Sequence, residues 1–382
     1  MKNIFFLGFF LVILSVYSLG CWYVFHRVVQ AINSPIAKTI FTWLFWLLSA
    51  SFIVGMMLER GNASAFTSII SGIGSTWLAV FWYSFLLVLA FDVVRLANHF
   101  FHFLPTNFPS QYLTPGTLLV SGAALVLVVV GAGFINAAFP RVHPLDVTID
   151  KPGNEKKELT IALVSDIHMG FIIGNERVSR MIDNINATHP DIVIFAGDLV
   201  DHNPKPVVQS NMGQHFKRLK APLGVYAVTG NHEFIGHPEV SVDYLTRCGI
   251  TYLRDTMISV GGIQIAGRED NQKIRFTGEA RMQLDVLLQK ADRTKPLILI
   301  DHQPVEYDGA QQQGVDLMLS GHTHEGQLWP FKILTHKIYG LHHGLMTRGS
   351  SHFYVTPGYG TWGPPVRLGN RPEIALIKIH FK

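Results

Sequence analysis

The chain has 382 residues, of which 48% are hydrophobic, and its formal net charge is +4. The first 145 residues carry six basic and two acidic side chains, so they account for the whole net charge and the rest of the chain is balanced. This balance, together with the lack of any basic run interleaved with aromatic residues, excludes general nucleic-acid binding.

The N-terminal part of the chain is apolar over long stretches. Up to position 145 the charged residues are Lys2, Arg27, Lys38, Glu59, Arg60, Asp92, Arg95 and Arg141. Uncharged apolar runs, each near the ~20 residues that an α-helix needs to cross hydrocarbon, occupy 4–25, 39–58, 69–91 and 117–139. We therefore predict an all-α region of four transmembrane helices over residues 1–145, and hence a multi-pass membrane protein with the lipid bilayer as a partner.

Two features of this region leave alternatives open. The run at 4–20 follows a basic residue and could be a cleaved export signal, although three further spans follow it. Lys and Arg are distributed almost evenly between the two sides, which leaves the side of the catalytic part undecided. Asp92 and Arg95 are three residues apart, a spacing that allows an ion pair on one helix face.

Beyond an expected linker at 146–157, residues 158–382 are expected to form one catalytic domain. Short runs rich in β-branched residues predict buried strands at 159–165, 191–196, 224–229, 296–300 and 315–320. Further strands are expected at 251–253, 262–266, 352–356 and 373–380, with helices at 175–186 and 281–289. The mixture of these elements predicts an α/β fold.

A polar cluster follows each of the five buried strands. The clusters are Asp166-Ile167-His168, Gly197-Asp198-Leu199-Val200-Asp201, Gly230-Asn231-His232-Glu233, His302, and Gly321-His322-Thr323-His324. Loops at the carboxyl ends of strands converge in open α/β sheets, so we expect the clusters to meet in one pocket. The glycines at 197, 230 and 321 fit sharp turns and a close approach of the backbone.

The residue types in these clusters are those of a metal site. Carboxylate and imidazole ligands without cysteine suit Mn, Fe or Zn, and the sequence does not choose among these ions. Two divalent ions can hold a phosphoryl group and convert a water into a nucleophilic hydroxide. The pattern therefore predicts metal-dependent hydrolysis of a phosphate ester.

The order of the motifs, D-x-H, G-D, G-N-H-E, a lone His and G-H-T-H, resembles the calcineurin-like metallophosphoesterase family from about residue 158 to the C-terminus. The tail from Gly358 to Arg367 resembles its YkuE-like branch, some of whose members carry transmembrane helices. The resemblance implies a two-sheet sandwich flanked by helices. It also implies a first metal on Asp166, His168 and His324, a second on Asn231, His302 and His322, Asp198 as the bridge between them, and His232 as the group that protonates the leaving oxygen or stabilises transition-state charge.

Some residues near these motifs are expected to play lesser parts. Asp201 and Glu233 are interpreted as supports that hydrogen-bond the backbone or orient a ligand. Histidines 202, 342 and 343 are interpreted as ordinary loop residues. Glu325 stands where the YkuE-like branch usually has glycine, which leaves the substrate open.

The aromatic segment around Trp329 and Phe331 bears on the substrate. Packing of both rings into the core is slightly favoured, whereas exposure beside the metals would admit a lipid-linked phosphate. The expected function is a membrane-anchored, dinuclear-metal-dependent phosphoesterase that hydrolyses phosphate mono- or diesters by metal-activated hydroxide attack, with lipid-linked phosphates among its candidate substrates. One alternative is a membrane scaffold or sensor that binds phosphate ligands without turnover. A second, implied by the resemblance, is a nucleotide-linked glycolipid pyrophosphatase.

Overall fold

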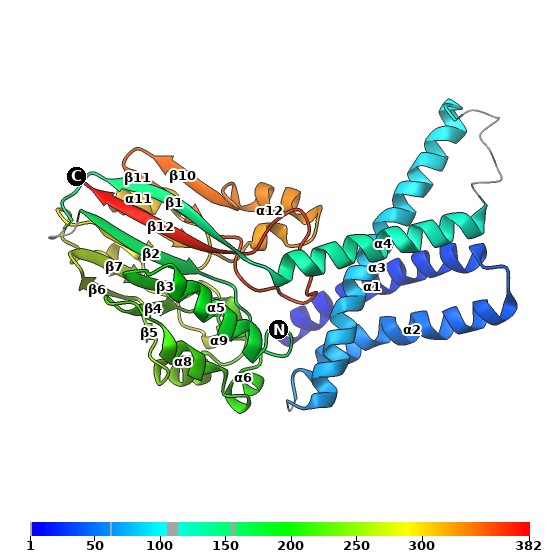
Figure 1. Ribbon diagram of the computed structural model, residues 1–382, viewed down its shortest axis with the longest axis horizontal. Helices are drawn as coiled ribbons and strands as arrows, with labels where there is room; N and C mark the ends of the chain where they lie inside the picture. The colour runs from blue at the N-terminus through cyan, green and yellow to red at the C-terminus, as the bar shows by residue number, and fades with distance from the viewer. Residues whose placement is uncertain (1, 62, 105–113, 154–156) are drawn as a thin grey trace. The chain divides into compact units, whose positions relative to one another are not determined.

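The computed structural model describes residues 2–61, 63–104, 114–153 and 157–382 (Figure 1). It separates into two compact units, Met1–Gly133 and Phe134–Lys382. The first unit is helical, and the second contains every strand that the structure describes. Each unit is considered by itself below.

Four long apolar helices make up the N-terminal part: α1 (Lys2–Ala31), α2 (Pro35–Leu58), α3 (Ala65–Phe101) and α4 (Pro115–Ala138). All four are long and apolar enough to cross a membrane, which confirms the predicted all-α membrane region. Ser34 and Ser64 cap α2 and α3 by accepting hydrogen bonds from backbone N–H groups in the first turn. Helices α2 and α3 therefore each begin where a serine side chain replaces a hydrogen-bond partner that the first turn of a helix lacks.

Two contacts inside this unit depend on individual side chains. A Cβ at Gly74 of α3 would lie 2.6 Å from the Cα of Phe52 in α2, so the small residue lets the two backbones approach closely. Asp92 accepts hydrogen bonds from Tyr23 at 2.6 Å and from Arg27 at 2.8 Å. The ion pair of Asp92 is therefore with α1 and not with Arg95, because packing of neighbouring helices outweighs spacing along a single helix.

The second unit holds two six-stranded mixed sheets. The first sheet has the order β1-β12-β2-β3-β4-β5 and the second β10-β11-β9-β8-β7-β6. The strands of the first sheet are β1 (Arg141–Ile149), β2 (Glu158–Val164), β3 (Ile192–Ala196), β4 (Val225–Val228), β5 (Thr251–Tyr252) and β12 (Glu373–Phe381). Those of the second are β6 (Thr256–Val260), β7 (Ile263–Gly267), β8 (Leu297–Ile300), β9 (Leu317–Ser320), β10 (Gly344–Arg348) and β11 (Ser351–Val355).

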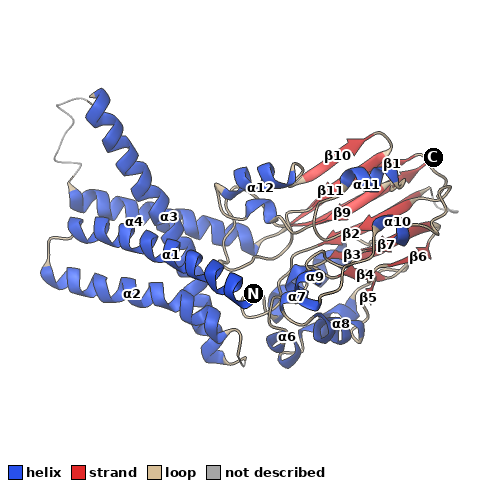
Figure 2. Ribbon diagram, turned by 180° about the vertical axis from the view of Figure 1, so that it is seen from behind, coloured by secondary structure: helices blue, strands red, loops and turns tan. Residues whose placement is uncertain are grey.

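The two sheets pack face to face with helices outside them (Figure 2). Alternate residues of β2 serve different layers, because successive side chains of a strand point to opposite faces. Ile161 and Leu163 join the core between the sheets, whereas Ala162 and Val164 pack under the helices. This architecture confirms the predicted α/β two-sheet sandwich flanked by helices.

Helices and short turns fill the connections between the strands. They are α5 (Asn175–Ala187), α6 (Lys205–Gln209), α7 (Asn231–Ile235), α8 (Pro238–Thr246), α9 (Lys273–Thr277), α10 (Leu284–Leu287), α11 (Tyr307–Gln312) and α12 (Phe331–Tyr339), with 3-10 turns at Met212–Arg218 and His324–Gly326. The buried residues of α5, Val178, Met181, Ile182 and Ile185, follow the helical period and pack on the first sheet.

The sequence does not anticipate β1. Residues 141–145 were expected in the membrane region and 146–149 in the linker, yet all of them pair in parallel with β12. In this strand at the edge of the sheet only Val147 and Ile149 are buried. Such an exposed edge strand lacks the continuous apolar run that identifies a buried one.

Candidate metal centre

The predicted clusters lie where neighbouring parallel strands end. Asp166 and His168 follow β2, Asp198 follows β3, and His322 and His324 follow β9. Each of these five residues has a positive φ, between 49° and 71°, a conformation that costs free energy for any residue other than glycine and that concentrates at functional sites. Asn231 and His232 open α7 after β4, and His302 follows β8.

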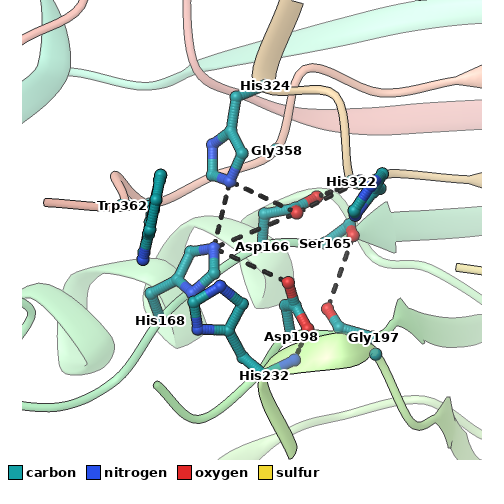
Figure 3. A network of polar contacts seen from close by, with 12 residues as sticks. Ser165, Asp166, His168, Gly197, Asp198, His232, His322, His324, Gly358 and Trp362 are labelled. Atoms are coloured by element: carbon teal, nitrogen blue, oxygen red, sulfur yellow. Dashed lines mark hydrogen bonds and ion pairs between the residues drawn. The ribbon is translucent and has the colours of Figure 1, made fainter. Parts of the chain in front are cut away.

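One group of ligand atoms comprises those of Asp166, His168 and His324 (Figure 3). The Nε2 atoms of the two histidines are 3.0 Å apart, and Asp166 Oδ1 lies 3.4 Å from Nε2 of His324. Burial, assisted by the neighbouring His232, lowers the pKa of His168 to about 3. Burial, assisted by Arg367, lowers the pKa of His324 well below its usual value. Both rings are therefore neutral and have a lone pair available for a metal.

A second group comprises Asp198, His302 and His322. Asp198 Oδ2 is 3.2 Å from Nε2 of His302, and the side-chain oxygen of Asn231 is 2.9 Å from Nδ1 of His322 and 3.2 Å from His302 Nε2. The same Asp198 oxygen lies 3.9 Å from Nε2 of His168 in the first group. The carboxylate of Asp198 therefore lies close to side-chain ligand atoms of both groups.

His232 lies beside both groups. Its backbone N–H donates to Asp198 Oδ1 at 2.8 Å, and its Nδ1 is 2.8 Å from Oδ1 of Asp201. Burial alone would lower the pKa of His232, but Asp198 and Asp201 raise it to about 9. Ligand atoms of Asp201, His202 and His232 also gather closely enough to hold an ion, and the hydrogen bonds of Asp201 to both histidines account for that gathering.

Glu233 supports the loops that hold these groups. Its buried carboxylate accepts backbone N–H groups from Asp198 at 3.0 Å, Val200 at 3.0 Å and Gly230 at 2.7 Å. It thereby joins the end of β3 to the start of α7. Gly230 completes this junction, because a Cβ there would overlap the carboxylate of Asp198. Asp201 and Glu233 thus act on a neighbouring histidine and on the backbone, as the sequence indicates.

Two residues that contact the predicted ligands could not be identified from the sequence. The hydroxyl of Tyr339, the last residue of α12, is 2.9 Å from Nε2 of His322. Arg367 is fully buried, donates to the Gly360 carbonyl at 2.7 Å, and has Nη2 3.2 Å from Nδ1 of His324. The only feature of the sequence that draws attention to Arg367 is its place in the tail that resembles the YkuE-like branch.

The loop after the last histidine differs from the favoured expectation. Trp329 is 50% exposed and Phe331 is 38% exposed, so the two rings do not pack into the core. Glu325 has φ 48° and ψ 35°, a left-handed conformation that glycine adopts at a lower cost than glutamate does. Its carboxylate lies 3.8 Å from Nδ1 of His343.

The donor set fits divalent metal ions. The two groups offer carboxylate oxygens, an amide oxygen and imidazole nitrogens at the carboxyl ends of buried strands, and no cysteine lies among them. Several of these nitrogen and oxygen atoms face one another at 3.0–3.4 Å, an arrangement that a cation between them would stabilise. Mn, Fe and Zn suit such a mixture of oxygen and nitrogen donors.

Comparisons with known proteins agree with this architecture. Residues 159–326 match the calcineurin-like phosphoesterase family. The metallophosphoesterase Cj0846 of Campylobacter jejuni is 29% identical over 99% of both chains. A metallophosphoesterase of Aquifex aeolicus is 31% identical over 67% of this chain and 98% of that protein, and YkuE of Bacillus subtilis is 29% identical over 57% of this chain and 78% of YkuE. The chain spans 64% of the length of two Helicobacter pylori metallophosphoesterases that it matches at 33% and 32% identity.

A two-sheet α/β sandwich that gathers Asp, Asn and His side chains at its strand ends defines a protein with a candidate metal centre. Together with the family match and the relatives, it identifies the chain as a member of the calcineurin-like phosphoesterase family. The predicted resemblance to that family and to its YkuE-like branch is thereby confirmed.

Proposed function

We propose that the protein is a multi-pass, membrane-anchored phosphoesterase that uses two divalent metal ions to hydrolyse phosphate mono- or diesters. The observation that carries this proposal is the position of Asp198 between two groups of ligand atoms, with His232 bonded to its carboxylate. In the proposed assignment, Asp166, His168 and His324 hold one ion, and Asn231, His302 and His322 hold the other. Asp198 bridges them.

The chemistry that divalent ions supply at such a site is the activation of a water and the neutralisation of charge on a phosphoryl group. The protein's own residues do the rest. Hydrolysis breaks the bond between phosphorus and the leaving oxygen, and that oxygen must gain a proton. Asp201 accepts a hydrogen bond from Nδ1 of His232 at 2.8 Å, which fixes the ring and leaves its other edge to donate a proton. His232 is therefore the proposed proton donor.

A lipid-linked phosphate ester is the proposed class of substrate. The four apolar helices anchor the chain at a bilayer, and α4 ends three residues before β1 begins. Exposed aromatic side chains, Trp329 and Phe331, follow the last histidine pair. A short tether and exposed apolar surface both favour a substrate that has an apolar part.

Hydrolysis of bis-p-nitrophenyl phosphate and p-nitrophenyl phosphate tests the proposed activity. The full chain would be extracted from membranes, stripped of metal and given Mn, Fe, Zn or Mg singly. We expect metal-restored turnover of both compounds. His232→Asn should reduce the turnover of esters with a poor leaving group by about 100-fold or more, the typical contribution of a positioned acid, and that of the two p-nitrophenyl esters by less. The matched control is His380→Asn, because His380 lies at the other end of the sheet, opposite Glu158 at the start of β2. Binding of metal without turnover in the parent protein would instead favour a phosphate-binding sensor.

A further inference from the structure

Helix α12 (Phe331–Tyr339) presents an unusual surface for a protein unit with three buried hydrophobic clusters. None of its side chains is buried. Exposed apolar side chains between 38% and 61% accessible belong to Trp329, Phe331, Ile333, Leu334 and Ile338. A contiguous stretch of this kind marks an interaction surface in most proteins.

The charged residues within this stretch of the sequence have one sign. Between Gly326 and Arg348 the sequence contains no Asp or Glu, whereas α12 itself contributes Lys332 and Lys337. Lys337 is exposed. A short helix that combines exposed apolar side chains with lysines is typical of segments that lie in the interface of an anionic membrane.

The position of α12 within the second unit points to the same partner. The backbone N–H of Trp329 donates to the Leu368 carbonyl at 2.9 Å, and Nζ of Lys332 donates to the Gly369 carbonyl at 3.4 Å. The side chain of Asn136, in the last turn of α4, donates to the carbonyls flanking these two, those of Arg367 and Asn370, at 2.9 and 2.7 Å. The start of α12 and the end of a candidate membrane span are therefore fixed to the same four-residue segment, 367–370.

We propose that Trp329 and α12 form an interfacial element that lies on the membrane surface, with its apolar side chains among the upper acyl chains and the exposed Lys337 at anionic headgroups. The bilayer is the proposed partner because α4 is long and apolar enough to cross it, and because α4 and α12 both contact residues 367–370. Tyr339 at the end of this helix contacts His322, so docking holds the candidate metal centre at the level of the headgroups. This inference concerns membrane contact and does not require the proposed enzymatic activity.

Depth-dependent fluorescence quenching tests this docking in the full chain. The variant Ile338→Cys would be labelled with an environment-sensitive fluorophore, since the native Cys21 and Cys248 are buried. The labelled chain would be placed in nanodiscs of phosphatidylcholine and phosphatidylglycerol that contain lipids with a spin label near the top of the acyl chain. The matched control is Val286→Cys, at an exposed apolar position of α10 beside an acidic residue, Asp285.

We expect strong quenching at position 338 and little at position 286, because an interfacial helix lies about 5–10 Å below the headgroup boundary. Adding Lys337→Glu to Ile338→Cys should reduce this quenching in anionic nanodiscs. Equal quenching at the two positions would overturn the inference. A second result would also overturn it. This result is a blue shift of the fluorophore emission at position 338 that occurs without quenching and depends on the number of chains per nanodisc, because such a shift would indicate contact with a second copy. No outcome depends on turnover, so failure here is distinct from failure of the proposed function.

Discussion

The hydrogen bond between Asp201 and His232 allows a quantitative test of the proton donor. Oδ1 of Asp201 accepts from the ring at 2.8 Å, and the charge of Asp201 is one of the influences that raise the pKa of His232 to about 9. Asp201→Asn retains the shape and an accepting oxygen but removes the negative charge. The variant therefore isolates the electrostatic part of the contact.

The size of the effect follows from the strength of such bonds. A hydrogen bond to a charged group contributes about 1.5–3 kcal/mol, against about 0.5–1.5 kcal/mol for a neutral one. The difference of about 1–1.5 kcal/mol corresponds to a roughly tenfold change in rate. We expect this loss of kcat for esters with a poor leaving group, which need a proton, and a smaller loss for p-nitrophenyl esters.

The assay compares kcat over a series of phosphate esters with different leaving groups, for the parent, Asp201→Asn and the control Asp243→Asn. Asp243 is an exposed carboxylate of α8, and its substitution should change nothing. Bound metal would be counted in each variant, and Asp201→Asn should retain its ions because Asp201 is outside the proposed ligand set. An equal loss of kcat for every leaving group, or a loss of bound metal in Asp201→Asn, would show that Asp201 does not act through the proton donor His232.

Three further substitutions have defined outcomes. Tyr339→Phe removes the hydroxyl that contacts His322, and we expect metal affinity measured by calorimetry to fall about 10- to 100-fold at one of two sites. Gly358→Ala places a methyl 2.7 Å from Cβ of Asp166, at a φ of +80°. Chemical denaturation should show that the free energy of unfolding falls by about 1–3 kcal/mol. Gly74→Leu should lower the melting temperature of the detergent-solubilised chain because its Cβ meets α2, whereas Gly72→Leu, which faces open space, should not.

Much of the fold is predictable because its strongest signals are local. The apolar runs that became α1 to α4 exceed the length of the hydrocarbon layer, and the strands that precede the clusters are short and β-branched. The convergence of the clusters follows from the parallel strands that end beside one another. These inferences need no knowledge of tertiary contacts.

Other features depend on contacts between distant segments, which local patterns do not contain. Strand β1 was assigned to the membrane region and linker because its partner, β12, lies more than 200 residues away in the chain. Tyr339 and Arg367 reach the candidate ligands from α12 and from the tail. Trp329 is exposed although aromatic residues are usually buried. Its exposure depends on the tertiary packing around it, which local sequence patterns do not contain.

In the proposed site, the chain holds two catalytic metal ions bridged by Asp198. The most direct test titrates the metal-stripped full chain with Mn while bound metal and turnover of bis-p-nitrophenyl phosphate are measured in the same samples. We expect two ions per chain, turnover that develops as the second ion binds, and loss of both the second ion and turnover in Asp198→Ala. A single ion at saturation, or turnover that survives Asp198→Ala, would contradict it.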